Sequence, residues 1–158
     1  MEGQVHNLFK LLISIETKLS DVYMALATLT EDGQFSKVFD RAYYEAIEYK
    51  HRFIDLRKNL LPETELFSEK ILGDAQQVEK QLSSLTKSAR ALEKNSSFYN
   101  LANHVIEFET RLCKLYCEIC NEAWEKEQQF ISSILAKKEE RLADMLPFKK
   151  LLSPDKNL

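Results

Sequence analysis

The chain contains little glycine and little proline, with three residues of each among 158. These two residues interrupt helices and mark turns most strongly, so their scarcity argues against a loop-rich or β fold. Charged residues make up 30% of the chain and hydrophobic residues 44%, a balance typical of helices with one apolar face. A chain of this length can bury a real core as one unit. We therefore predict an all-α protein with a single domain, 1–158.

Other absences exclude whole classes of partner. A formal net charge of −3 provides no basic field for nucleic acid. No apolar run approaches the roughly 18 residues that a membrane helix needs, and the N-terminus carries no recognisable export signal. Three cysteines without an export signal are typical of reduced thiols rather than of disulfides. We expect a cytoplasmic protein that binds neither nucleic acid nor membranes.

One stretch of sequence occurs twice. Eleven residues around Glu16 return ninety-three positions later around Glu109, and five of the eleven are identical. Each copy places a tyrosine, Tyr23 or Tyr116, seven residues after its glutamate. At about 100° per residue, seven residues bring the tyrosine within roughly 20° of the glutamate on the same helix face. The repeat predicts a duplicated helical hairpin.

Apolar periodicity predicts where the four main helices lie. The first runs from about 4 to 29 and the second from about 35 to 60, each with one apolar stripe. The third carries the second copy of the repeat, and the fourth runs from about 127 to 146, where Pro147 ends it. The repeat favours a turn between the third and fourth helices. One continuous helix is the alternative, because residues 121–129 contain neither Gly nor Pro.

A connecting segment, 62–96, joins the two hairpins, 4–61 and 97–146, and a short tail, 147–158, follows them. The apolar residues of the connecting segment recur in alternating steps of four and three. They are Ile71, Ala75, Val78, Leu82, Leu85, Ala89 and Leu92. Such a seam is typical of a coiled coil, so it indicates either a dimerisation helix or a crossover lying along the outside of the bundle. Twenty helical residues cover about 30 Å, enough to cross a bundle from end to end.

Two hairpins, a helical crossover and the duplicated E-x6-Y helices resemble the rubrerythrin-type, ferritin-like diiron-carboxylate family. The resemblance covers residues from about 5 to 60 and 98 to 146. It implies a ferritin-like four-helix bundle made of two duplicated hairpins, with a helical crossover between helices 2 and 3. In that family the first and third helices each supply a Glu, and the second and fourth each supply a Glu-x-x-His. Glu16 and Glu109 match the first and third positions.

The second helix departs from the family pattern. Glu48-Tyr-Lys-His51 is a literal Glu-x-x-His, but a helical wheel puts it nearly opposite the apolar face. The family's spacing instead falls on Ala46 and Tyr49. An insertion in the preceding turn, or a bulge in the helix, would rotate Glu48 and His51 inward, so they stay as the weaker candidate ligands.

The fourth helix departs from the pattern at one of its two positions. The family's spacing falls on Glu139, whose flanking apolar residues suit an inward position, while Leu142 stands where the family has His. When the chain is aligned to the family pattern without insertions or deletions, the predicted metal ligands are therefore Glu16, Glu109 and Glu139. Three carboxylates without imidazole suit one hard cation better than an iron pair. Without a metal, each needs a proton or a hydrogen-bond partner, for which Tyr23, Tyr116 and Tyr49 are natural donors.

Two functions follow from these expectations. The first is a bundle with a degenerate diiron site that is non-catalytic or binds metal atypically. The alternative is a rubrerythrin-like diiron oxidoreductase or iron-handling protein with an atypical ligand set. The cofactor is accordingly iron or another divalent metal, or there is none, and enzymatic activity stays open. Because the chain lacks the paired C-x-x-C module of a rubredoxin centre, a redox-active form needs an external electron donor. A homodimer is the other expected partner.

The cysteines are a further candidate cluster. Cys113, Cys117 and Cys120 fall within about 80° of Glu109 on the third helix. A lone C-x-x-C inside a helix is a weak metal signal, and we expect these thiols to be buried as small hydrophobic groups.

Overall fold

The fold consists of long helices. The described residues of the computed structural model are 4–30, 33–59, 69–90, 98–122 and 125–152. Within them the chain forms five helices and no strand, namely α1 (Gln4–Leu29), α2 (Gly33–Lys58), α3 (Glu69–Arg90), α4 (Phe98–Glu122) and α5 (Glu125–Leu152). The all-α prediction is confirmed. No helix in the described ranges is long and apolar enough to cross a membrane.

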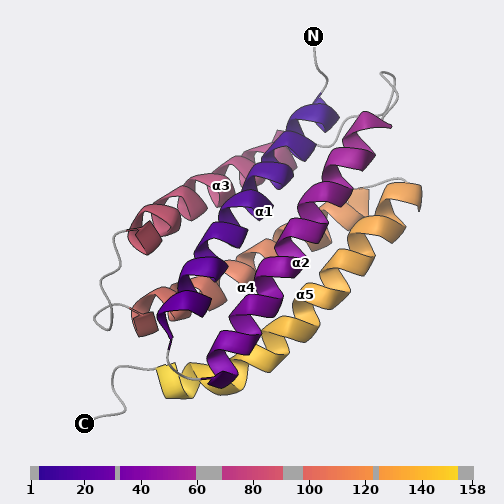
Figure 1. Cartoon of the computed structure of the whole chain (residues 1–158). Helices are drawn as coiled ribbons and strands as arrows, with labels where there is room; N and C mark the ends of the chain where they lie inside the picture. The colour runs from indigo at the N-terminus through magenta and orange to yellow at the C-terminus, as the bar shows by residue number, and fades with distance from the viewer. Residues whose placement is uncertain (1–3, 31–32, 60–68, 91–97, 123–124, 153–158) are drawn as a thin grey trace.

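The helices form a bundle in which successive helices run in opposite directions (Figure 1). α1 packs along α2, and α4 packs along α5. α3 lies on the outside of the bundle, against α1 and α4, and carries the chain back along its length. As a result α2 and α4 run in the same direction, and α1 and α4 face each other across the interior.

The apolar seam of α3 packs within its own chain. Ile71, Ala75, Val78, Leu82 and Ala89 are buried, and Leu85 is half-buried. The crossover interpretation is therefore confirmed for these positions, and the interpretation of the seam as a dimerisation surface is wrong. Leu92 lies outside the described residues, and a homodimer through another surface stays a prediction.

Most helix ends agree with the predictions. α1 has the expected bounds, and α2 begins and ends two residues early. The expectation of two separate helices after the second repeat, rather than one continuous helix, is confirmed, because α4 ends at Glu122 and α5 begins at Glu125. The prediction that Pro147 ends the last helix is wrong, since α5 continues to Leu152. A proline inside a helix removes one backbone hydrogen bond and favours a kink, and this helix continues past that local loss.

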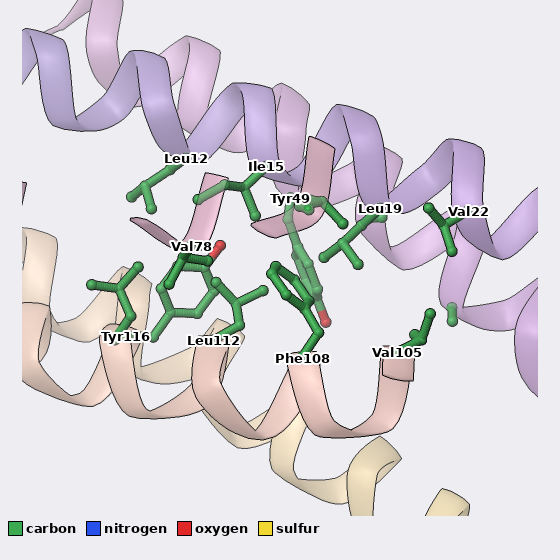
Figure 2. Close-up of a cluster of buried hydrophobic side chains, with 14 of the residues drawn as sticks. Leu12, Ile15, Leu19, Val22, Tyr49, Val78, Val105, Phe108, Leu112 and Tyr116 are labelled. Atoms are coloured by element: carbon green, nitrogen blue, oxygen red, sulfur yellow. The ribbon is translucent and has the colours of Figure 1, made fainter. Parts of the chain in front are cut away.

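The core is built from matching faces of α1 and α4. Figure 2 shows Leu12, Ile15 and Leu19 of α1 directed toward Phe108 and Leu112 of α4. Between residues 7 and 29 of α1, ten residues are buried, and each has a buried counterpart ninety-three positions later in α4. The ten are Leu8, Phe9, Leu12, Ile15, Glu16, Leu19, Ser20, Val22, Tyr23 and Leu26.

The inward faces of α2 and α5 match at a different spacing. Five buried residues of α2, Phe39, Ala42, Ala46, Tyr49 and Phe53, lie ninety-two positions before Ile131, Ile134, Lys138, Arg141 and Met145 of α5, which are all buried. The helix ends agree, because α1 and α4 end ninety-three positions apart whereas α2 and α5 begin ninety-two apart. The connection in the second hairpin is one residue shorter. One residue corresponds to about 100° of rotation, so it decides which side chains of α5 face the interior.

Candidate functional site

Two glutamates face each other in the middle of the bundle. Glu16 of α1 is 0% exposed and Glu109 of α4 is 1% exposed. Both helices surround their glutamate with large apolar residues, so turning either carboxylate out to solvent would bury polar surface and expose core. The sequence-based expectation that these two carboxylates share the interior is confirmed. Their role as metal ligands stays a prediction.

Each glutamate accepts a hydrogen bond from the tyrosine of the opposite helix. Tyr116 Oη donates to Glu16 Oε1 at 2.7 Å, and Tyr23 Oη donates to Glu109 Oε1 at 2.6 Å. Burial and the nearby carboxylates raise the pKa of both phenols well above the ordinary value. The phenols therefore stay protonated as donors, as expected from the sequence. Tyr49, the third expected donor, points its hydroxyl toward Glu45 Oε2 at 3.5 Å instead.

α5 places two cations against this pair. Lys138 is 0% exposed, and its Nζ lies 2.9 Å from Glu16 Oε1 and 3.5 Å from Glu109 Oε1. The contacts are ion pairs by distance, although their angles are not those of hydrogen bonds. Arg141 Nη2 lies 3.4 Å from Glu109 Oε1, and Arg141 Nη1 donates to Glu45 of α2. Charged groups from four helices thus meet in one network.

Aromatic rings complete the surroundings of the two cations. Lys138 Nζ lies 5.2 Å from the ring centroid of Tyr49 and 5.6 Å from that of Tyr116. Arg141 Cζ lies 5.4 Å from the ring centroid of Tyr23. Cations above aromatic faces are attracted by the ring quadrupole, and the attraction is stronger where water is excluded. The site therefore offers both cations a negative environment.

The two glutamates differ in their electrostatics. Burial raises the pKa of Glu16, and the charge of Glu109 raises it further, while Lys138 opposes both effects. Burial also acts to raise the pKa of Glu109, but Lys138 and Arg141 together with the Tyr23 hydrogen bond outweigh it, so this pKa is lowered. Glu109 is therefore the firmly ionised member, and Glu16 is the member that takes up a proton more readily.

Two carboxylate oxygens of this site lack a partner. Glu16 Oε2 and Glu109 Oε2 are buried without a hydrogen bond from any part of the chain that the structure describes. Buried polar atoms in folded proteins normally have a partner, which can be protein, an ordered water or an ion. These oxygens could therefore accept from water or bind a small cation.

The expectation that Glu139 shares this site is wrong. Glu139 is exposed and Leu142 is half-buried, whereas Lys138 and Arg141, one residue earlier in each case, are buried. The error comes from carrying the ninety-three-residue spacing through a connection that is one residue shorter. A spacing of ninety-two residues from the apolar face of α2 would have placed Lys138 and Arg141 in the interior. That spacing was not considered, because Lys and Arg are rarely buried without a partner.

The weaker candidate ligands do not reach the site either. Glu48 and His51 are exposed, and Glu48 Oε1 pairs with Arg52 Nη2 at 3.1 Å on the surface. The helical wheel, which put this motif opposite the apolar face, was correct. Among the described residues, no three His, Cys, Asp or Glu side chains converge as a metal-binding group. Glu45, which the sequence reasoning did not single out, is the carboxylate that α2 contributes.

The cysteines behave only partly as expected. Cys113 and Cys120 are buried, but Cys117 is exposed. Burial, with the charge of Glu109, raises the pKa of Cys113 to about 12, so that thiol is protonated at neutral pH. The three side chains therefore do not form a buried thiol cluster.

Comparison with known proteins gives no match to a family model, to a curated protein or to a solved structure.

Proposed function

We propose that this chain is a divergent ferritin-like bundle whose metal centre has been replaced by its own cations. In this proposal it is a non-catalytic helical protein rather than a diiron enzyme. The observation that carries the proposal is the position of Lys138 Nζ, 2.9 Å from Glu16 Oε1 and 3.5 Å from Glu109 Oε1 at full burial. The ammonium lies where a bridging metal would have to contact both carboxylates.

The ferritin-like ancestry is supported by the connections and by the repeat. Two antiparallel hairpins are joined by a crossover, and glutamates from α1 and α4 meet in the interior, as they do in ferritin-like diiron proteins. The ten matching buried positions of α1 and α4 support an internal duplication. The five pairs in α2 and α5 support it once the shorter connection is taken into account. In this alignment Lys138 and Arg141, three residues apart, take the positions of Glu and His on the fourth helix.

Charge and space argue against a metal in the same place. Divalent cations bind carboxylate oxygens at about 2.0–2.6 Å, so an ion bridging Glu16 and Glu109 would contact the Lys138 ammonium and be repelled by it. The two central carboxylates are already matched by two positive charges, Lys138 and Arg141. The network thus supplies internally the neutralisation that metal ions supply in a diiron site.

An atypical metal site is the second candidate, and one observation favours it. Glu16 Oε2 and Glu109 Oε2 are buried without a hydrogen-bond partner in the described ranges, so they are free to bind a cation. Such an ion would need Lys138 to move away or to lose its proton. The metal would then be held by oxygens, which suits Mg²⁺ or Mn²⁺.

Metal analysis separates the two candidates. The protein is purified from medium supplemented with iron and manganese, and its metals are quantified per chain. We expect well below one tenth of an equivalent, unchanged in Glu16→Gln. One equivalent or more in the wild type, lost in Glu16→Gln, would overturn the proposal in favour of the metal-bound form.

Restoring a Glu-x-x-His to the inward face of α5 tests whether the two cations replace a metal. The double variant Lys138→Glu with Arg141→His gives α5 an inward Glu-x-x-His, and we expect it to bind a divalent metal through Glu16 and Glu109. The matched control places the same pair on the exposed face, as Lys137→Glu with Glu140→His. Equal metal uptake by both double variants would show that the inward position has no special role.

A further inference from the structure

On the outer side of the bundle, α3 and α4 border a groove of about 770 Å³, a volume within the usual range for small-molecule sites. Its floor is apolar, because Val78 and Leu115 line it and are buried. Its walls carry charged and amide side chains from both helices. The groove therefore combines an apolar base with a charged rim.

The charges of the rim are divided between its two ends. At one end Lys70 lies between two carboxylates, 3.7 Å from Asp74 and 3.6 Å from Glu118. Because α3 and α4 run in opposite directions, the contact between Gln81 and Arg111 marks the other end. Lys80 also lines the groove and is next to Gln81 along α3. Lys114 lines it between the two ends, three residues from Arg111 and four from Glu118 along α4.

The second end carries positive charge that no carboxylate of the described residues pairs with. Arg111 donates to the uncharged amide of Gln81. Within the ranges that the structure describes, Lys80, Arg111 and Lys114 form no ion pair with a carboxylate. Three cations from two helices therefore line the part of the groove between Lys114 and the Gln81–Arg111 contact, in a chain whose net charge is −3. A local excess of this kind attracts a small multivalent anion.

We propose that this groove binds a phosphate ester of a small organic molecule of about the size of a nucleoside monophosphate. The phosphate would lie against Lys80, Arg111 and Lys114, where Arg can donate two parallel hydrogen bonds and Lys adds point charge. The organic part would cover Val78 and Leu115. Its hydroxyl or amine groups would donate to Asp74 and Glu118 at the far end.

The length of the groove favours a small molecule over an acidic peptide. From Lys70 to Gln81 is eleven residues of helix, which at 1.5 Å per residue covers about 16 Å. An extended peptide advances about 3.3 Å per residue, so at most five residues would fit. Only one end is positive, so a run of acidic side chains would meet carboxylates at the other end. A ligand with one anionic group fits both observations.

Titration calorimetry on the intact chain tests the assignment, with adenosine monophosphate, inorganic phosphate and adenosine as probes. We expect the nucleotide to bind more tightly than phosphate, and adenosine to bind at least tenfold more weakly than the nucleotide. Arg111→Gln and Lys114→Ala are each expected to weaken nucleotide binding about tenfold, because each removes a charge-assisted contact. Raising the salt concentration from 50 to 500 mM should weaken it further by screening.

Lys137→Ala is the matched control, since this lysine is exposed on α5 and does not line the groove. We expect it to change nucleotide affinity less than twofold, and circular dichroism to show that all variants remain helical. Binding of adenosine as tightly as the nucleotide would overturn the proposal. So would equal weakening by Lys137→Ala and Lys114→Ala, or binding of a short acidic peptide without binding of any phosphate probe.

Discussion

Replacing Lys138 with methionine is the most direct test of the buried network. Methionine keeps the unbranched shape of the lysine stem but removes the ammonium between Glu16 and Glu109. At an effective dielectric constant of about 20, the gross attraction is about 6 kcal/mol across 2.9 Å and about 5 kcal/mol across 3.5 Å. Desolvation of the ammonium offsets much of this, which is why deleting one partner of a buried pair typically costs about 3–5 kcal/mol.

Protonation of Glu16 limits the loss and makes it depend on pH. The ordinary pKa of this carboxyl is 4.5. At pH 7, keeping it protonated in the folded variant therefore costs about 3.4 kcal/mol, because each pH unit above the unfolded pKa adds about 1.36 kcal/mol. At pH 5 the cost falls to about 1 kcal/mol. The folded variant binds about one more proton than its unfolded chain at pH 7, and still more than the unfolded chain at pH 5, so its stability increases as the pH falls.

Urea denaturation at pH 7 and pH 5 measures this effect. We expect Lys138→Met to lower the free energy of unfolding by about 3 kcal/mol at pH 7 and by about 1 kcal/mol at pH 5. Lys137→Met, at the neighbouring exposed position, is expected to change it by no more than about 0.5 kcal/mol. Adding Glu16→Gln to Lys138→Met should recover most of the loss. The reasoning is refuted if the loss is the same at both pH values, or if Lys137→Met costs as much.

Three further predictions concern groups around the network. Tyr116→Phe removes the hydrogen bond to Glu16, and we expect urea denaturation to show a loss of about 1.5–3 kcal/mol, as for hydrogen bonds to charged groups. The pKa of Glu109 is lowered, so its contribution is complete above about pH 4.5 and is lost as the pH falls through the folded pKa. Between pH 5 and pH 3, the free energy of unfolding should therefore fall less in Glu109→Gln than in the wild type. Native alkylation followed by mass spectrometry should modify exposed Cys117 first, and Cys113 only after unfolding, because burial raises its pKa to about 12.

The fold could be predicted largely because the apolar stripes are regular. Leu12, Ile15 and Leu19 repeat at helical spacing with no competing pattern, and the repeat located α4 without any structural information. The scarcity of Gly and Pro indicated the all-α class, but it left few residues from which the helix ends could be predicted. Pro147 lies inside α5, which continues to Leu152, so the position of a proline did not mark the end of this helix.

The site could be predicted only in its first half. Glu16 and Glu109 were found because each lies inside a repeated apolar stripe, and a buried carboxylate is conspicuous there. Lys138 and Arg141 could not be found by the same spacing, because the second connection is one residue shorter and contains no Gly or Pro that would mark it. Helix rotation by about 100° per residue turns so small a change into a different set of inward side chains.

The network also has a consequence for the alignment of the helices along their axes. Apolar stripes that repeat every three or four residues would pack almost as well if one helix slid by seven residues, about 10.5 Å, past its neighbours. Such a slide would separate Lys138 from Glu16 and leave both charges buried and unpaired, which is far more costly than a repacked leucine. The ion pairs join four helices at one position along the bundle, through Glu16, Glu45, Glu109 and the two cations. They therefore select a single register from several that the hydrophobic residues alone would permit.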